Sequence, residues 1–197
     1  QICIDSHAAD YKGLKHVAKI LAGDILTVTG KEPEIVEQIQ NVLQIVAATK
    51  GTSDILAKWE EEKKIDLSVL EGKREVFMVQ LIEEDGAEKL VIVGTETIAT
   101  LYGLYYISEN IGVSPWVYWA DVVPAPKKEI VFDKSICTVS KEPSVRYRGF
   151  FMNDEWPSLG NFVMHTFGDF NEFFYEKVFD LLLRLKGNYF WPAMWSA

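Results

Sequence analysis

Residues 145–157 read Val-Arg-Tyr-Arg-Gly-Phe-Phe-Met-Asn-Asp-Glu-Trp-Pro, and this stretch decides the class of fold. The first eight residues alternate as a β-strand does, which predicts a strand over 145–152. This strand ends in Asn153 and two adjacent carboxylates, Asp154 and Glu155. Buried carboxylates destabilise a protein unless they are paired or hydrogen-bonded, so such an end is a poor core element. Carboxylates beside aromatic rings are typical of sugar chemistry, in which they exchange protons with a glycosidic oxygen or a water.

The residues that follow this strand continue a β-α-β pattern. We expect a loop over 154–168, a helix over 169–186 with Asp169 as its cap, and a strand over 189–195. Units of this kind build parallel barrels, but one unit cannot close a barrel because its sheet keeps open edges. The sequence therefore predicts that residues 144–197 are the first β-α-β of a catalytic (β/α)8 barrel, truncated here, and that the chain is the amino-terminal portion of a larger protein.

The residues before this strand predict a different kind of domain. The stretch 141–144, Lys-Glu-Pro-Ser, is the best linker candidate, so we expect an accessory domain over 1–140. Its order of elements makes a mixed α/β sandwich, with an extended aromatic stretch over 115–121. The expected helices cover 10–29, the residues after the cap Ser53, and 95–111; the expected strands cover 2–4, 41–48, 74–82, 89–93 and 129–132.

The charge of the chain narrows the classes of partner. The 197 residues carry a formal net charge of −9. Phosphate binding needs clustered cations, so we expect neither nucleic acid nor an anionic membrane surface as a partner. No apolar run approaches the roughly 18 residues of a membrane span. The three histidines are widely spaced and show no metal-ligand pattern, and we expect no metal and no cofactor.

Two further observations concern the ends of the chain and its cysteines. The sequence shows no signal peptide and starts at Gln1, which suggests that a leader was removed or that the chain was trimmed. Cys3 and Cys137 could pair, because the two edges of a domain often meet. Two buried thiols are the simpler interpretation, since free cysteines are commonly buried.

The candidate site residues each have an ordinary structural alternative. Successive strand residues point to opposite faces, so at most one of Asp154 and Glu155 faces a barrel interior while the strand lasts. The alternative is a turn whose acids cap the next segment or meet Arg146 or Arg148. These two arginines share a strand face with Asp154 and could bind a substrate carboxylate bidentately, or pair structurally with Glu142, Asp154 or Glu155.

The tryptophans of the last strand give a second group of candidates. Trp191 and Trp195 share strand parity, so they can line one face together. With Trp156 they could form a platform on which the apolar face of a sugar stacks. The alternative is ordinary aromatic packing, since tryptophans are mostly buried.

Several of these motifs together resemble glycoside hydrolase family 115, the xylan α-1,2-glucuronidases. The resemblance is carried by residues 144–157, by the run Leu-Leu-Leu-Arg-Leu-Lys-Gly-Asn-Tyr-Phe-Trp-Pro-Ala-Met-Trp over 181–195, and upstream by 102–105 and 112–122. It implies an α/β accessory domain, like the leading domains of families 20 and 67, followed by a catalytic (β/α)8 barrel. It also implies that the α-1,2 bond between (4-O-methyl)glucuronic acid and xylan is hydrolysed with inversion.

The resemblance also implies roles for single residues. Asp154 or Glu155 would serve as a carboxylate of the site, Asn153 would donate to a sugar hydroxyl, and Trp191 and Trp195 would shape the wall. Arg148 would meet the uronate. An inverting pair stands about 6.5–9.5 Å apart to admit a water, so these adjacent acids are not expected to be the whole pair, and another carboxylate is expected beyond residue 197.

The expected partner is glucuronoxylan, a polysaccharide or oligosaccharide substrate, and the enzyme is expected in the periplasm or outside the cell. The full-length enzyme could form a homodimer, and this portion alone is expected to be inactive. Two alternatives stay open. One is a non-catalytic carbohydrate-binding or interaction module, and the other is a hydrolase of different glycan specificity, such as a hexosaminidase.

Overall fold

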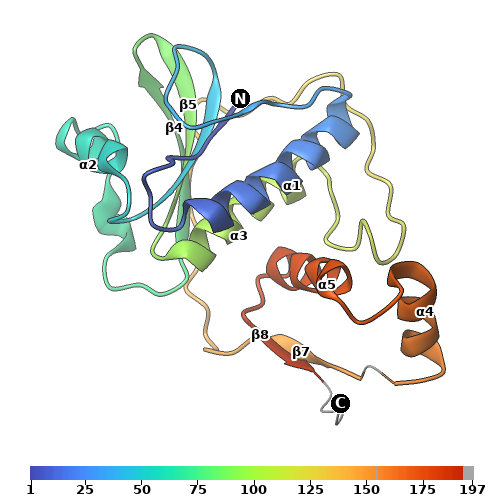
Figure 1. Cartoon of the computed structure of the whole chain (residues 1–197). Coiled ribbons are helices and arrows are strands. Elements are labelled where there is room, and N and C mark those ends of the chain that lie inside the picture. The colour runs from blue at the N-terminus through green and yellow to red at the C-terminus, as the bar shows by residue number, and fades with distance from the viewer. Residues whose placement is uncertain (154, 193–197) are drawn as a thin grey trace.

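A mixed β-sheet organises the first part of the chain (Figure 1). The computed structural model describes residues 1–153 and 155–192, and within them this sheet has the order β2-β1-β3-β5-β4-β6. Strands β1, β2, β3 and β5 run parallel, whereas β4 runs antiparallel to β5 and β6. The strands are β1 Ile2–Cys3, β2 Ile35–Val36, β3 Gln44–Thr49, β4 Phe77–Glu84, β5 Ala87–Gly94 and β6 Cys137–Val139.

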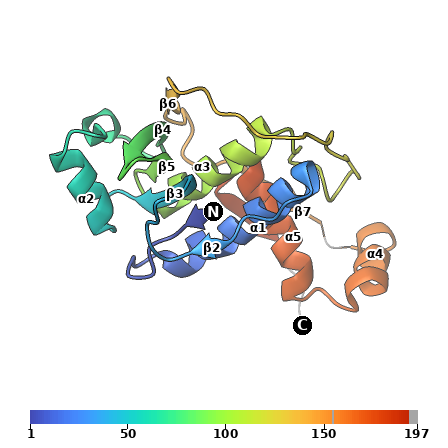
Figure 2. The same ribbon diagram turned by 90° about the horizontal axis from the view of Figure 1, so that it is seen from above.

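Helices cover both faces of this sheet (Figures 1 and 2). On one face, α1 (Tyr11–Thr29) and α3 (Thr97–Asn110) lie side by side over a core that includes Leu14 and Ile92. On the other face, α2 (Asp54–Glu61) and the 3-10 turn η1 (Leu67–Leu70) enclose Trp59 and other apolar side chains. The predicted mixed α/β class is therefore confirmed.

Helix α1 shows how sequence periodicity builds this layer. Leu14, Val17 and Leu21 recur at helical spacing and are all buried against the sheet. The helix ends at Gly30, whose φ of 73° is left-handed and whose N–H donates to the carbonyl of Leu26 at 2.7 Å. The predicted helix over 10–29 is confirmed.

Two expectations for the middle of the chain are wrong, and one strand was not expected. The segment 129–132 is not a strand, because Ile130 and Phe132 pack against the core while β6 pairs with β4 in their place. The segment 115–121 is turned rather than extended, with the N–H of Ala120 donating to the carbonyl of Trp116 at 2.9 Å. The short strand β2 had no periodic signal in the sequence.

The cysteines do not pair. Cys3 is buried in β1, whereas Cys137 is exposed in β6, and both are free. Strands β3, β5 and β4 separate β1 from β6 in the sheet, and strands lie about 4.8 Å apart. That separation far exceeds the reach of a disulfide, so pairing is wrong, and the expectation of two buried thiols holds only for Cys3.

A second sheet holds two parallel strands, β7 (Gly149–Met152) and β8 (Tyr189–Pro192). Helix α5 (Glu172–Arg184) connects them, which confirms the predicted β-α-β order. Helix α4 (Ser158–Phe167) occupies the segment that we expected to be a loop. Asn171, not Asp169, caps α5, because its Oδ1 accepts from the N–H groups of Phe173 and Phe174 at 3.1 and 3.2 Å. Strand β7 begins at Gly149 and is therefore shorter than predicted, whereas residues 193–195 of the predicted last strand lie outside the described part.

Helix α5 packs across α1 and α3, as Figures 1 and 2 show, so the second sheet is attached to the first part of the chain. Arg184 of α5 reaches Asp24 of α1 in a buried ion pair. The hydroxyl of Tyr105 in α3 donates to Asp180 of α5 at 2.7 Å. These contacts join residues that precede the segment 141–144 to residues that follow it. The role of this segment as a domain boundary stays a prediction.

Candidate active site

The carboxyl ends of β7 and β8 bring the candidate residues to one edge of the second sheet. The register pairs Gly149 with Tyr189 and Phe151 with Trp191. A parallel pair places both carboxyl ends at the same edge, so the loop that begins at Asn153 leaves β7 beside the end of β8. The described part of β8 ends at Pro192, and Asp154 and Trp195 lie outside the described residues.

One face of this strand pair is covered. Phe150 and Phe190 point to the helix side, where they pack against a buried cluster that contains Phe174 and Val178 of α5. The rings of Phe150 and Phe190 meet edge to face, with centroids 5.8 Å apart. This packing anchors α5 to the strands and decides which side chains turn the other way.

The opposite face exposes aromatic rings. Phe151 and Trp191 are 57% and 55% exposed, and their rings meet edge to face at 6.1 Å. Tyr147 and Tyr189 form a second edge-to-face pair at 5.7 Å beside them. Four aromatic side chains on one uncovered face are a surface that a sugar ring could stack on. The role of Trp191 as part of a platform stays a prediction.

The loop after β7 exposes the two candidate residues that the structure describes there. Asn153 and Glu155 are both exposed. Within the described residues, no ion pair joins Glu155 to Arg146 or Arg148, which disfavours the pairing alternative for this acid. The carbonyl of Glu155 accepts from the N–H of Gly160 at 3.0 Å, so the backbone of this residue is held at the start of α4.

Trp156 fastens this loop to α4. Its indole lies directly over Gly160, where a Cβ would collide with the ring, so the helix needs a glycine at this point. The other side of the indole meets Phe170 edge to face, with centroids 6.2 Å apart. Trp156 remains largely exposed and therefore does not lie in the core of the described part.

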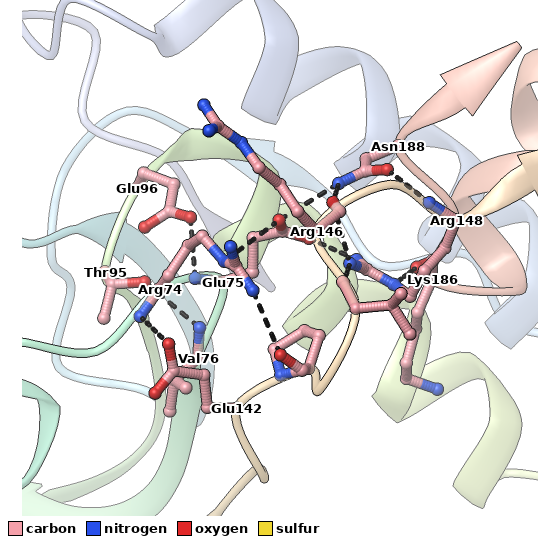
Figure 3. A network of polar contacts seen from close by, with 12 residues as sticks. Arg74, Glu75, Val76, Thr95, Glu96, Glu142, Arg146, Arg148, Lys186 and Asn188 are labelled. Atoms are coloured by element: carbon pink, nitrogen blue, oxygen red, sulfur yellow. Dashed lines mark hydrogen bonds and ion pairs between the residues drawn. The ribbon is translucent and has the colours of Figure 1, made fainter.

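A polar network holds the amino ends of the same two strands (Figure 3). Arg148 and Asn188 each precede a strand, and they bond to each other. The N–H of Arg148 donates to Oδ1 of Asn188 at 2.9 Å, and the N–H of Asn188 donates to the carbonyl of Arg148 at 2.8 Å. Glu75, next to β4, accepts from Nδ2 of Asn188 at 3.0 Å and forms an ion pair with Nη2 of Arg148.

Arg148 is therefore engaged inside the protein. Its Nε donates to the carbonyl of Lys186 and its Nη1 to the carbonyl of Val145, both at 3.0 Å, and Nη2 is directed at Glu75 and Tyr102. These contacts favour a structural role over the expected contact with a uronate, and among the described residues the acid that Arg148 meets is Glu75 rather than Glu142 or Glu155. Because β7 begins only at Gly149, the strand-parity argument that aligned Arg146 and Arg148 with Asp154 does not apply.

Tyr102 of α3 also belongs to this network. Its hydroxyl donates to the carbonyl of Gly187 at 2.9 Å, just ahead of β8. Burial raises the pKa of Tyr102 to about 12, so the hydroxyl keeps its proton and stays a donor. The sequence did not indicate that Glu75, Tyr102 and Asn188 belong to one network, because their partners lie far away along the chain.

The described residues contain no group of three or more His, Cys, Asp or Glu side chains that could hold a metal ion. In the same part of the chain, no helix has the length and apolarity that crossing a membrane requires.

Comparison with known proteins shows which family this chain resembles. The sequence model described as Glycosyl hydrolase family 115 matches residues 140–197. A solved structure described as a novel family GH115 4-O-methyl-alpha-glucuronidase, BtGH115A, with specificity for decorated arabinogalactans, is similar to this chain. The match has a TM-score of 0.82 and 33% sequence identity over 98% of this chain. The chain spans only 24% of that protein's length.

A second solved structure, described as CpGH84D, is similar over 76% of this chain and 21% of its own, with 12% identity and a TM-score of 0.41. That likeness is too low to carry an argument. No curated protein matches the sequence.

Proposed function

Since the chain belongs to glycoside hydrolase family 115, we propose that it supplies part of the active site of an enzyme that releases (4-O-methyl)glucuronic acid from xylan side chains. Family membership supports a glycosidase. The proposal that this glycosidase is an α-glucuronidase rests on one observation, which is the 33% identity over 98% of the chain to a 4-O-methyl-alpha-glucuronidase.

We propose that β7, α5 and β8 are the first β-α-β of a (β/α)8 barrel. In such barrels the helices form the outer ring, so the strand face turned away from α5 is the one that looks into the barrel. That face carries Phe151 and Trp191, and its carboxyl edge leads to Asn153 and Glu155. Barrel enzymes build their sites at this edge, which supports the proposed roles of these residues.

The reaction that we propose is inverting hydrolysis of an α-1,2 bond. One carboxylic acid protonates the leaving oxygen while a carboxylate activates a water on the opposite face of the sugar. Asp154 or Glu155 supplies one of these groups or positions the water, and Asn153 donates to a hydroxyl of the sugar. Because the two catalytic groups stand about 6.5–9.5 Å apart, we propose that a further carboxylate comes from the remainder of the barrel.

A second substrate has a specific observation in its favour. The related structure belongs to a protein described as specific for decorated arabinogalactans. The same uronic acid on an arabinogalactan backbone would also be joined through an α-glucuronidic bond, so this polysaccharide is the competing candidate. For either polymer we propose that the enzyme acts in the periplasm or outside the cell, where such substrates occur. Its assembly as a homodimer stays a prediction.

The test uses the full-length enzyme on both polysaccharides. We expect at least one of Asp154→Ala and Glu155→Ala to lower kcat/KM for uronic acid release about 100-fold or more, as loss of an acid-base group does. Glu88→Ala, which removes an exposed acid in the first sheet, is the matched control and should leave kcat/KM unchanged. Proton NMR of the freshly released sugar should show the β anomer first, because inversion changes an α bond into β.

Near-normal kcat/KM for both variants on both polysaccharides would remove these acids from the site. If the wild-type enzyme binds the polymers but releases no uronic acid, the non-catalytic binding module is the correct interpretation.

A further inference from the structure

Glu75 belongs to the first part of the chain, yet its carboxylate serves the second sheet (Figure 3). The residue lies two positions before β4 and is only 7% exposed. Both oxygens of its carboxylate are directed at residues that immediately precede the strands β7 and β8, with Oε2 on Arg148 and Oε1 on Asn188. One side chain therefore contacts the amino ends of both strands.

The backbone at Glu75 is held in an unusual conformation. Its φ is 55°, a left-handed value that residues other than glycine rarely adopt. The N–H of Glu75 donates to Oε1 of Glu96 at 2.7 Å, and the N–H of Val76 donates to Oγ1 of Thr95 at 3.1 Å. Strained conformations persist only where the surroundings over-determine them, and they concentrate at functional sites.

The register of β7 and β8 depends on the residues that Glu75 holds. Arg148 and Asn188 bond to each other through backbone and side chain just before the paired residues Gly149 and Tyr189. The described part of each strand has four residues and spans about 13 Å at roughly 3.3 Å per residue. A slip by one residue would turn every side chain of a strand to the other face. Phe151 would then leave Trp191, and the loop at Asn153 would point elsewhere.

We propose that Glu75 is a positioning residue for the candidate active site. By binding Arg148 and Asn188 it fixes the register of β7 against β8, and so it determines which side chains stand together at the carboxyl ends. The first part of the chain is then an integral element of the site rather than a separate accessory. The effect of Glu75 on catalysis rests on the proposed function, whereas its effect on the register of β7 and β8 does not.

The chain offers a matched control at the other end of β4. Glu84 is also a buried carboxylate, 2% exposed, and it also forms ion pairs, in this case with Lys58 and Lys64. All of these contacts lie within the first part of the chain. Glu84→Gln therefore removes a comparable charge without touching β7 or β8.

The first measurement is hydrogen exchange in the full-length protein, at a temperature at which both variants are folded. In Glu75→Gln the amides of β7 and β8 should exchange about tenfold faster or more, because the charge that binds Arg148 is lost. In Glu84→Gln the same amides should stay within about twofold of the wild type. Equal effects of the two variants on these strands, or no effect of Glu75→Gln, would overturn the proposal.

The second measurement separates kcat from KM on the polysaccharide that the wild type cleaves. Glu75→Gln should lower kcat about tenfold or more with KM changed less than about threefold, because misplaced reacting groups slow the chemical step while most sugar contacts remain. Glu84→Gln should leave both constants near the wild type. Faster exchange with an unchanged kcat would also overturn the role in positioning.

Two other outcomes are an inactive wild-type enzyme and a Glu75→Gln protein that does not fold. A wild-type enzyme without uronic acid release defeats the proposed function, while the exchange experiment still decides whether Glu75 fixes the strands. If Glu75→Gln does not fold, Glu75→Asp replaces it, because aspartate keeps the charge but has a shorter side chain. Hydrogen exchange and kinetics of Glu75→Asp are then compared with those of Glu84→Asp, and the same results support or overturn the proposal.

Discussion

Arg184 binds Asp24 through two hydrogen bonds, from Nη1 to Oδ2 at 2.9 Å and from Nη2 to Oδ1 at 3.2 Å, across 160 positions of sequence. The same guanidinium donates through Nε to Asp180 at 2.9 Å and lies over the ring of Tyr105. This buried cluster joins α5 to α1 and α3. Because α5 connects the two strands of the candidate site, the cluster determines where that site sits on the rest of the fold.

Asp24→Asn should lower the free energy of unfolding by about 3 kcal/mol, because it leaves a buried guanidinium without its bidentate partner. Urea denaturation measures this change. Glu88→Gln, which breaks an exposed pair with Lys134, is the control and should cost less than about 0.5 kcal/mol. Similar losses in the two variants would show that the buried pair contributes no more than a surface pair.

Glu84 should make stability depend on pH in the acid range. Burial opposes its charge, but hydrogen bonds from Lys58 and Lys64 outweigh this and lower the pKa of Glu84 to about 2, from an ordinary value of 4.5. Its contribution is therefore complete above about pH 4.5 and is lost as the pH falls towards 2. Both lysines are partly exposed, so we expect a loss of about 2 kcal/mol rather than the full value of the shift.

Urea denaturation of the wild type and of Glu84→Gln at pH 7 and at pH 2.5 tests this expectation. The variant should lose less stability than the wild type between the two pH values. Equal losses would show that Glu84 does not titrate as the geometry implies.

Gly149→Ala should disrupt the second sheet. A Cβ at this position would collide with the carbonyl oxygen of Tyr189, a backbone atom of the neighbouring strand that cannot move aside. We expect a loss of about 3 kcal/mol or more, in line with overpacking against a fixed neighbour. Gly13→Ala in α1 is the matched control, because nothing lies within 4 Å of its Cβ, and it should stabilise the protein by about 0.5–1 kcal/mol. A Gly149→Ala protein as stable as the wild type would contradict the close approach of these strands.

Trp191→Ala should weaken substrate binding in the full-length enzyme with little effect on stability, since the side chain is 55% exposed. Loss of one stacking ring is worth about 1.4 kcal/mol, which corresponds to a roughly tenfold rise in KM. Trp116→Ala removes a similarly exposed tryptophan from the turn after α3 and should leave KM unchanged. If both substitutions leave KM unchanged, the aromatic face does not contact the sugar.

Features with a local signal were predictable from the sequence. Leu14, Val17 and Leu21 carry the period of α1, and Gly30 marks its end, so this helix is where we expected it. The alternating aromatic residues of β7 and β8 and the apolar stripe of α5 likewise predicted the β-α-β unit. The family resemblance rested on the same local motifs.

Features that depend on distant partners were not predictable. Helix α4 follows Pro157 and contains Gly160, both typical of a loop, and the indole of Trp156 packs against Gly160 where a side chain would otherwise stand. Arg148 was expected to meet a uronate, but its partner Glu75 lies 73 positions away and is directed at it by a left-handed backbone. Nothing near either residue in the sequence signals this contact. The roles of Asp154 and Trp195 lie outside the described residues and stay predictions.

The attachment of α5 to α1 and α3 has a consequence for biosynthesis. Two paired strands alone bury too little surface to persist by themselves in water. During translation, residues 1–140 leave the ribosome first, and domains generally fold in that order. The earlier helices then offer Asp24 and Tyr105 as a ready template on which the nascent β-α-β segment can assemble.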